Sequence, residues 1–596
     1  MTEEESERLL PISNPATEAN VQSRLFQKYK IKSYLIKKFP IIQWLPNYRW
    51  QYFQCDMIAG ITVAMTVIPQ GLAYAKIAGL LPQYGLYSAF MGCFVYSIFG
   101  TAKDITLGPT AIMSLMTASF GSSPIQNDPT YALILTFIGG FVQLLMGLFN
   151  LGFLIRFISA PVLSAFTTAA AITIGFTQVK NILGLKNIPK HFLECVYYTF
   201  AKLGETNVWD LILGIFCIIV LHMIKKLRTI NWDDEGESIT LSQKIARKFL
   251  WILGTAANSV VVIGAAGIAA AIISVYPDKA MFTLTGEIQS GLPPFKIPKF
   301  IISHGNITQS TAEIFSNIGP GFFIIPFIGI IETIAIGKSF ARKNCYKLDA
   351  TQEFVALGVA NIFSSFVSSY PIAGSFSRTA VNSQSSVKTP AGGIITGTVV
   401  IIALILLTPA FKYIPNAALA AIIMSAVLQM VDFKIIQRLW NIQKVDFFIY
   451  ILTLIGSFAL GVEYGILIGI GLSLFPLLYP LSQPDIQIQD SSIPVIWLEL
   501  GLQFPASEYF EDRIIDLLNT SGRPQAVIID CKNVFRLDYT AVKTIEKIIT
   551  HLEHHNISLV LTGLKANEKN KLTEASISPL QFSSSVESAI EQISKE

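Results

Sequence analysis

The sequence predicts a polytopic α-helical membrane protein that ends in a soluble α/β domain. Three observations predict this fold class: little charge overall, long apolar runs in the middle of the chain, and polar composition at both ends. Only 14% of the 596 residues are charged, and mean hydropathy is +0.52. Soluble domains carry about 25% charged residues, so a wholly soluble enzyme of this length is excluded.

Charged side chains divide the chain into three parts. They occupy about one position in four over residues 1–56 and 484–596, but about one in ten between them. We therefore expect a cytosolic N-terminal region over 1–56, a transmembrane domain over 57–483 and a cytosolic domain over 484–596.

Apolar runs without Lys, Arg, Asp or Glu follow one another through the middle part. A helix needs about 20 apolar residues to cross the hydrocarbon core, and continuous runs argue against a β-barrel. Long runs cover 57–75, 77–102, 105–127, 129–155, 157–179, 249–277, 354–377, 389–411, 413–431 and 464–484. Shorter runs cover 211–224, 314–331 and 447–462.

Lysine and arginine residues cluster next to several of these runs. All of the clusters fall on one side of the membrane if the chain has fourteen spans. They precede the first span and follow the sixth, eighth and twelfth, which places those ends and both termini in the cytosol. The loop 276–313 then faces outside or a lumen. It holds the sequon at Asn306, which we expect to be glycosylated.

The two halves of the middle part repeat weakly. Residues 70–76 (QGLAYAK) parallel 332–338 (ETIAIGK), and Thr110-Ala parallels Thr379-Ala. The offsets are similar, and seven spans separate the halves, so the second half is inverted. Inverted repeats are typical of secondary transporters.

The third and tenth segments are predicted to be broken helices. Gly, Pro and Ser interrupt 103–110 and 370–377, and helices are expected to begin near Thr110 and Ser377. Two helix N-termini that face each other form an anion site. Arg378 lies at the second one, and a buried arginine in a membrane is usually functional. A salt bridge or snorkelling remains the alternative for Arg378, and helix capping for Ser377.

Glu332 is a second intramembrane charge. A carboxyl group there can carry a proton, which offsets the charge of a divalent anion that moves with it. The alternative is a fixed ion pair with Arg378 or Lys338. Lys76 and Lys338 lie near span ends, where snorkelling is expected.

These motifs resemble the sulfate permease family of anion transporters. The resemblance rests on 68–75 (IPQGLAYA), 84–87 (YGLY), 108–115 (GPTAIMSL), 369–382 (SYPIAGSFSRTAVN) and 389–393 (TPAGG). Within the family, 332–341 (ETIAIGKSFA) favours the sodium-independent sulfate-transporting branch.

The resemblance implies fourteen spans in a seven-plus-seven inverted repeat. Core spans would cover about 57–155 and 319–412, and gate spans about 156–318 and 413–483. It also implies an elevator-type motion in a homodimer. The substrate-binding residues that it implies are Gln70, Tyr74, Thr110, Ser377 and Arg378.

The tail reads as alternating strands and helices and resembles the STAS domain. Strands are expected at 495–501, 526–531 and 557–562, and helices at 510–519, 539–554 and 585–595. We expect Thr540 to cap the second helix. No phosphate-binding glycine loop is present, which argues against nucleotide hydrolysis.

The sequence thus predicts a secondary active sulfate/anion transporter, by exchange or proton coupling, and not an enzyme. Its partners would be sulfate, chloride, bicarbonate or oxalate, the lipid bilayer and a second copy, with no nucleic acid, cofactor or metal. The six cysteines lack metal-ligand spacing, and no disulfide is expected. The alternatives are a chloride channel on the same fold, a nucleobase permease, which would not need Arg378, and a membrane-anchored signalling module.

The N-terminus carries a candidate sorting signal. Glu5 stands four positions before Leu9 and Leu10, the pattern that adaptors bind in an extended segment. We therefore expect the protein at the plasma membrane and at endolysosomal membranes.

Overall fold

A computed structural model describes most of the chain in two compact units, residues 1–468 and 469–596. The residues outside the description are 1–37, 126–127, 190–191, 228–249, 277–280, 287, 305–306, 490–492, 499–500, 521–523, 535, 576–579 and 596. The candidate glycosylation site at Asn306 and the sorting signal of Glu5, Leu9 and Leu10 therefore lie outside the described residues.

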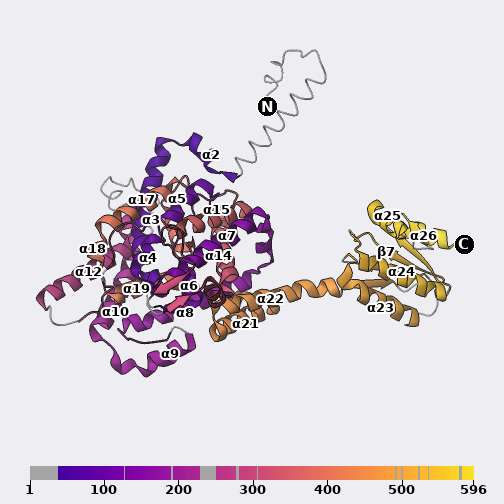
Figure 1. Ribbon diagram of the computed structural model, residues 1–596. Coiled ribbons are helices and arrows are strands. Elements are labelled where there is room, and N and C mark those ends of the chain that lie inside the picture. Colours follow the sequence, from indigo (N-terminus) through magenta and orange to yellow (C-terminus); the bar gives the residue numbers. More distant parts are fainter. Residues whose placement is uncertain are drawn as a thin grey trace, which may run out of the picture. The chain divides into compact units, whose positions relative to one another are not determined.

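The first unit is almost entirely helical, as Figure 1 shows. Its helices are α2 (Ile41–Trp44), α3 (Trp50–Ile77), α4 (Pro82–Tyr87), α5 (Met91–Phe99), α6 (Ala111–Phe120), α7 (Thr130–Leu148), α8 (Ala160–Ile182), α9 (Phe192–Ala201), α10 (Val208–Leu227), α12 (Ala257–Val275), α13 (Thr311–Ile318), α14 (Gly321–Lys343), α15 (Ala350–Ser365), α16 (Phe376–Gln384), α17 (Ala391–Leu406), α18 (Thr408–Phe411), α19 (Asn416–Val427), α20 (Lys434–Ile442), α21 (Lys444–Leu460) and α22 (Val462–Ser482), which continues into the second unit.

Within the described part of the chain, eight helical stretches are long and apolar enough to cross a membrane. They are α3, α7, α8, α10, α12, α14, α22 and the stretch Asn416–Ile442. A polytopic helical membrane protein is thereby confirmed, while the count of fourteen spans stays a prediction. The apolar run 77–102 is not one helix, because it begins with the turn after α3 and is then divided between α4 and α5.

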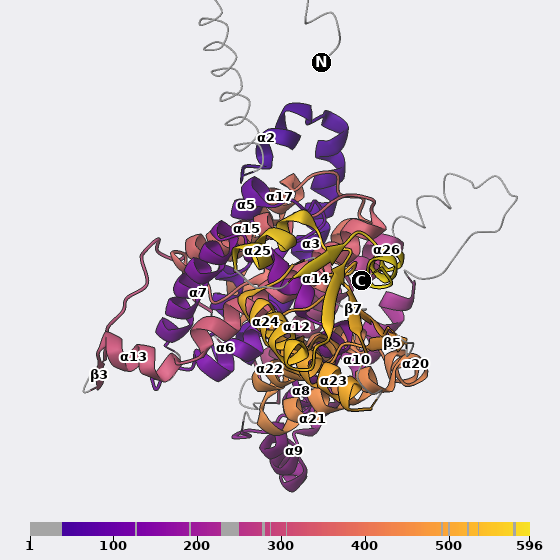
Figure 2. The same ribbon diagram turned by 90° about the vertical axis from the view of Figure 1, so that its right-hand side faces the viewer.

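The two halves of the first unit interlock. Helices α3, α5 and α7 of the first half pack on α15 and α17 of the second, and α8 and α10 pack on α19. Figures 1 and 2 both show α5, α15 and α17 side by side. Because each half buries its apolar faces against the other, neither half has a complete core of its own.

A two-stranded crossing joins the halves at their centre. Strand β1 (Leu107–Gly108) pairs antiparallel with β4 (Ala373–Gly374), and the half-helices α6 and α16 follow directly. This confirms the two breaks that the sequence predicts. A second small hairpin, β2 (Ile302–His304) with β3 (Ile307–Gln309), lies in the loop before α13.

The second unit is an α/β domain with its own core. Its sheet has the order β5 (Ile486–Gln489), β6 (Val495–Leu498), β7 (Ala526–Asp530), β8 (Ser558–Thr562) and β9 (Gln581–Ser583), with β5 antiparallel and the other pairs parallel. The helices are α23 (Phe504–Thr520), α24 (Tyr539–His554), α25 (Ala566–Glu574) and α26 (Val586–Ile593). Strands β5 and β9 and helix α25 were not expected from the sequence, because they are short and polar.

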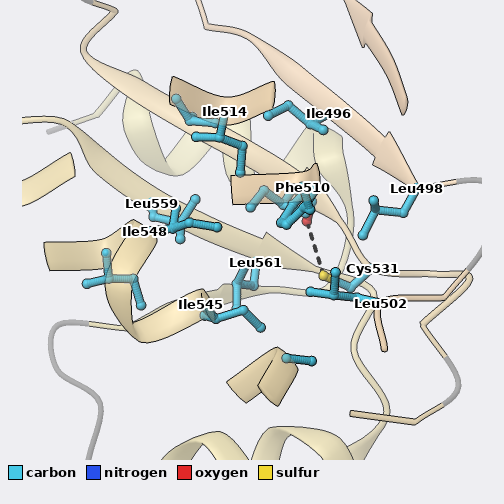
Figure 3. Close-up of a cluster of buried hydrophobic side chains, with 14 of the residues drawn as sticks. Ile496, Leu498, Leu502, Phe510, Ile514, Cys531, Ile545, Ile548, Leu559 and Leu561 are labelled. Carbon is cyan, nitrogen blue, oxygen red and sulfur yellow. Dashed lines mark hydrogen bonds between the residues drawn. The ribbon is translucent and has the colours of Figure 1, made fainter. Parts of the chain in front are cut away.

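Helices α23 and α24 cover one face of this sheet. Figure 3 shows Phe510, Ile545 and Ile548 of these helices gathered with Leu561 of β8 and with Cys531, which directly follows β7. Burial raises the pKa of the Cys531 thiol to about 12, so the thiol stays protonated and serves as a core side chain. Its Sγ donates to the Ile529 carbonyl oxygen at 3.7 Å.

The expected cap of α24 is wrong. The side chain at the N-cap belongs to Asp538, whose Oδ1 accepts from the Ala541 amide at 2.9 Å. Asp538 Oδ2 also accepts from the Phe504 amide at 2.7 Å, so one carboxylate ties the starts of two helices together. Thr540 lies one residue inside the helix.

Candidate anion-binding site

The crossing of β1 and β4 places two helix N-termini next to each other. Thr110 caps α6 through its Oγ1, which accepts from the Met113 amide at 3.1 Å. Helix α16 begins after Ser375, whose side chain makes no capping hydrogen bond. First-turn amides have no intrahelical acceptor, so α16 offers donors and a positive dipole end here. Ser377 is inside the first turn, which removes the alternative that it caps the helix.

Arg378 is fully buried behind this pair of helix ends. Its Nη1 donates to the Pro109 carbonyl oxygen at 2.7 Å, whereas Nε and Nη2 have no hydrogen-bond partner in the described part of the chain. Among those described residues it also makes no ion pair. Neither a salt bridge nor snorkelling therefore accounts for Arg378. A buried cation without a directly paired carboxylate is costly, and a bound anion would supply the missing hydrogen-bond acceptors and negative charge.

A close backbone approach makes room for the guanidinium. Gly108 has φ +153°, and a Cβ there would lie 3.2 Å from Arg378 Nη2. A glycine at this position therefore lets β1 pass directly beside the arginine.

Glu332 faces the same site from α14. The Thr110 hydroxyl donates to Glu332 Oε2 at 3.2 Å, and no cation of the described chain pairs with the carboxylate. Glu332 is half-buried because it lines two cavities. The alternative of a fixed ion pair with Arg378 or Lys338 is therefore not what the structure has.

Three other expected residues complete the cluster. Gln70 and Tyr74 project from the same face of α3. Gln70 Nε2 donates to Ser377 Oγ at 3.5 Å, and its Oε1 is buried without a partner in the described chain. Tyr74 is buried and lines a cavity with Thr110, Glu332 and Ser377.

This cavity measures about 40 Å³, enough for a few water molecules or a small oxyanion. Gln70 and Arg378 do not line it but lie behind its wall. The sequence did not single out Ser375, Phe376, Gln429 and Met430, which also line it. Ser375 could have been found in the Gly-Ser-Phe-Ser stretch, but nothing in the sequence links Gln429 and Met430 to the site.

A larger cavity of about 360 Å³ adjoins the small one. Both are lined by Ile112, Glu332, Phe376 and Met430, and the larger one extends between α8 and α14 as far as Asp432. Asp432 lies two residues before α20, on the side where α20 carries Lys434 and Arg438. An anion can therefore approach the site from that side.

The opposite end of α3 is tied down by hydrogen bonds. The Lys76 ammonium donates to Asn416 Oδ1 at the start of α19 and to Thr285 Oγ1. Thr283 in turn donates to Asp210 of α10 through its amide and its hydroxyl, the latter at 2.6 Å. The snorkelling expected for Lys76 is therefore wrong, because the side chain is partly buried against these groups.

A comparison with protein-family models finds the sulfate permease family over residues 53–453 and the STAS domain over residues 483–589. The first match covers more than half of the chain. The chain belongs to the sulfate permease family.

Relatives of this family member are similar over most of their length. A sodium-independent sulfate anion transporter of Bos taurus is 42% identical over 94% of this chain and 92% of its own. A chloroplastic sulfate transporter 4.1 of Arabidopsis thaliana is 31% identical over 90% and 79%. The expected family and its STAS tail are thus confirmed.

Solved structures share the fold. The overall structure of SLC26A9 matches with a TM-score of 0.81 at 20% identity, covering 96% of this chain and 94% of that one. The transmembrane domain of the cyanobacterial bicarbonate transporter BicA matches with a TM-score of 0.55 at 19% identity, covering 72% and 98%.

Gly108→Ala in this sulfate permease family member is expected to lower stability by about 1–3 kcal/mol, because the added Cβ strains the backbone and presses on Arg378. Thermal melting of the purified protein measures the change. Gly264→Ala is the matched control, since nothing lies within 4 Å of the added Cβ and stability should stay level or rise. Equal melting of Gly108→Ala and wild type would contradict the tight approach.

Proposed function

We propose that this chain is a sodium-independent transporter of sulfate and related small anions that works by alternating access. One observation carries the proposal: Arg378 is buried without an ion pair in the described chain, at the meeting point of two half-helix N-termini. A fixed positive charge and helix dipoles recognise a small anion. The printed names of the Bos taurus and Arabidopsis thaliana relatives support sulfate; chloride, bicarbonate and oxalate are further candidates.

The arrangement of helices supports two moving parts. Helices α3 and α5–α7 pack with α14–α17, whereas α8, α10, α12, α19 and α21 pack mainly with one another. We propose that the first group is the core, which carries the site, and the second is the gate. With this division, the core could carry the anion site across the membrane while the gate stays in place.

One-sided access favours a carrier over a chloride channel. The larger cavity approaches the site from the side of Asp432, while the contacts of Lys76 tie core to gate at the other end of α3. A channel would need a continuous path at the moment of conduction. This conformation would be the inward-facing one if the basic residues mark the cytosol.

We further propose that Glu332 carries a proton with sulfate. The carboxylate lines the cavity beside the anion site and has no cationic partner among the described residues, so it can be charged or neutral as the bound anion requires. Protonation would offset one of the two charges of sulfate.

Two further proposals come from the family resemblance and the sequence. A homodimer, the state that the resemblance implies, would appear as twice the chain mass by light scattering of the purified protein. Glycosylation of Asn306 would place the loop 276–313 outside the cytosol, and a glycosidase would then shift the electrophoretic mobility.

Arg378→Ala should reduce sulfate uptake into proteoliposomes by about 10- to 100-fold, since charge-assisted hydrogen bonds are worth about 1.5–3 kcal/mol. Arg378→Lys should retain part of the activity, because lysine keeps the charge but not the planar fork. Arg438→Ala on the exposed face of α20 is the matched control and should transport normally. If Arg378→Ala takes up sulfate at the wild-type rate at both limiting and saturating sulfate, the assignment of Arg378 to the anion site is wrong.

Glu332→Gln keeps the shape of the side chain but removes its proton. Sulfate movement in exchange for chloride is then expected to become electrogenic, because one charge of sulfate is no longer offset, or to lose its acceleration at acid pH. Flux measured with and without a pH gradient, together with membrane potential, distinguishes these results. Glu313→Gln, in the capping box of α13 away from the site, should leave both properties unchanged. If Glu332→Gln stays electroneutral and accelerates at acid pH, the proton travels elsewhere.

Replacing Leu9 and Leu10 together by alanine should move the protein toward the cell surface. The reason is that an adaptor groove would lose both leucine side chains while Glu5 alone cannot hold the segment. Surface biotinylation and microscopy against a lysosomal marker measure the ratio. An unchanged ratio would count against the signal and leave only integral membrane location.

A further inference from the structure

We propose that a second anion site, on the cytosolic side of the core, binds the phosphorylated headgroup of an inositol lipid. The site is a cavity of about 900 Å³ at the end of the core where α2, α5, α15 and α17 meet. Figure 2 shows these four helices close together. The cavity is distinct from the transport site, which it exceeds in volume more than twentyfold.

Most of the charged side chains in the wall of this cavity are cations. The charged residues that line it are Lys103, Arg156, Lys338, Lys347, Lys388 and Asp349. The acidic one is already used, because Asp349 Oδ1 accepts from the Thr351 amide at 3.0 Å and the Gln352 amide at 3.2 Å at the start of α15. Five positive charges therefore face one carboxylate that serves as a helix cap.

The cations come from five separate stretches of chain. Lys103 follows α5, Arg156 lies in the 3-10 segment after α7, Lys338 is on α14, Lys347 precedes α15 and Lys388 precedes α17. Arg156 and Arg342 lie close enough to Lys338 to act on its charge. In the described chain none of these five lysines and arginines forms an ion pair with a carboxylate. Folding thus gathers like charges that repel one another, and a bound polyanion would offset that repulsion.

A second observation points to an acceptor in the cavity. Trp44 lines it, and its indole Nε1 is buried with no hydrogen-bond partner in the described chain. An indole N–H can only donate, and a buried unpaired donor costs about 1–3 kcal/mol. A phosphate oxygen is a suitable partner.

Size and position decide the class of ligand. Pockets of about 300–1,000 Å³ hold drug-sized molecules, so a lone sulfate would leave most of this cavity empty and most of its cations unpaired. One part of the rim is aromatic and exposed: Phe153 lines the cavity, Phe157 lies against it with 6.3 Å between ring centroids, and the two side chains are 49% and 48% exposed. Exposed aromatics at the end of a membrane helix face lipid. A headgroup with several phosphates, attached to acyl chains along this rim, fits both features.

The experiment uses the purified full-length protein and two probes. Native mass spectrometry in micelles measures retention of phosphatidylinositol 4,5-bisphosphate against phosphatidylserine. Fluorescence anisotropy measures binding of labelled inositol 1,4,5-trisphosphate, the free form of the same chemistry. Retention of the lipid supports the proposal that the site binds a lipid headgroup. Binding of the free trisphosphate alone would assign the site to a soluble polyphosphate and overturn the proposal of a lipid ligand.

The test variant carries Arg156→Gln, Lys347→Gln and Lys388→Gln, all exposed side chains whose loss should leave the fold intact. The matched control carries Lys434→Gln, Arg438→Gln and Lys444→Gln, which remove the same charge from exposed positions on α20 and at the start of α21. We expect the test variant to bind at least about tenfold more weakly, since each lysine or arginine contributes about 1 kcal/mol, and the control to bind as wild type. Melting temperatures check folding, and single Arg156→Gln replaces the triple variant if it melts early.

If both triple variants bind the probes equally more weakly than wild type, the binding reflects a general attraction of the probes to basic surfaces. That result would overturn the proposed site. Absence of any binding to the wild-type protein by both probes would overturn it as well. Neither result depends on which anion the protein transports, because binding is measured without transport.

Discussion

The antiparallel crossing of β1 and β4 is the constraint on which the transport site depends. Extended backbone in the interior of a membrane protein leaves amides and carbonyls that need partners. The two segments solve this by pairing with each other, and the Thr333 hydroxyl accepts from the Gly374 amide at 2.9 Å. Because the pairing is only two residues long, both chains leave it as helices, and their N-termini end up at one place. Arg378 and Thr110 owe their positions to this short pairing.

Two long helices supply the rest of the site by simple geometry. Gln70 and Tyr74 are four residues apart on α3 and so share one face, and Glu332 takes the equivalent place on α14 in the second half. Both helices contain an internal proline, Pro69 and Pro326. The interlocked packing of α7 on α15 and of α3 on α17 then fixes these faces against the crossing. The repeated sequence segments on α3 and α14 therefore lie on two sides of the same site.

Much of the fold and of the candidate site could be predicted from the sequence, and each feature that could not be predicted has a physical reason. Hydropathy and the breaks at glycine, proline and serine predicted the apolar spans and the two half-helices, and pointed to Arg378, Ser377 and the helix start at Thr110. Gln70 and Tyr74 were implied only by the family resemblance. The structure brings these five residues close together. The partners of Lys76 could not be foreseen, because Asn416 and Thr285 reach it only through tertiary packing. Gln429 and Met430 of the site wall lie on the other group of helices. Asp538 took the cap of α24 because its side chain also satisfies the Phe504 amide, a contact 34 residues away in sequence.

The pairing of one fixed cation with one titratable carboxyl near it has a consequence for which anions can exchange. With Glu332 ionised, its charge cancels that of Arg378, and a bound chloride leaves the site with a net charge of minus one. With Glu332 protonated, as we propose for sulfate, the divalent anion and Arg378 also sum to minus one. The moving core would then carry the same charge with either load, so the membrane potential would do no net work on an exchange of the two. A single proton would make a monovalent and a divalent anion electrically interchangeable.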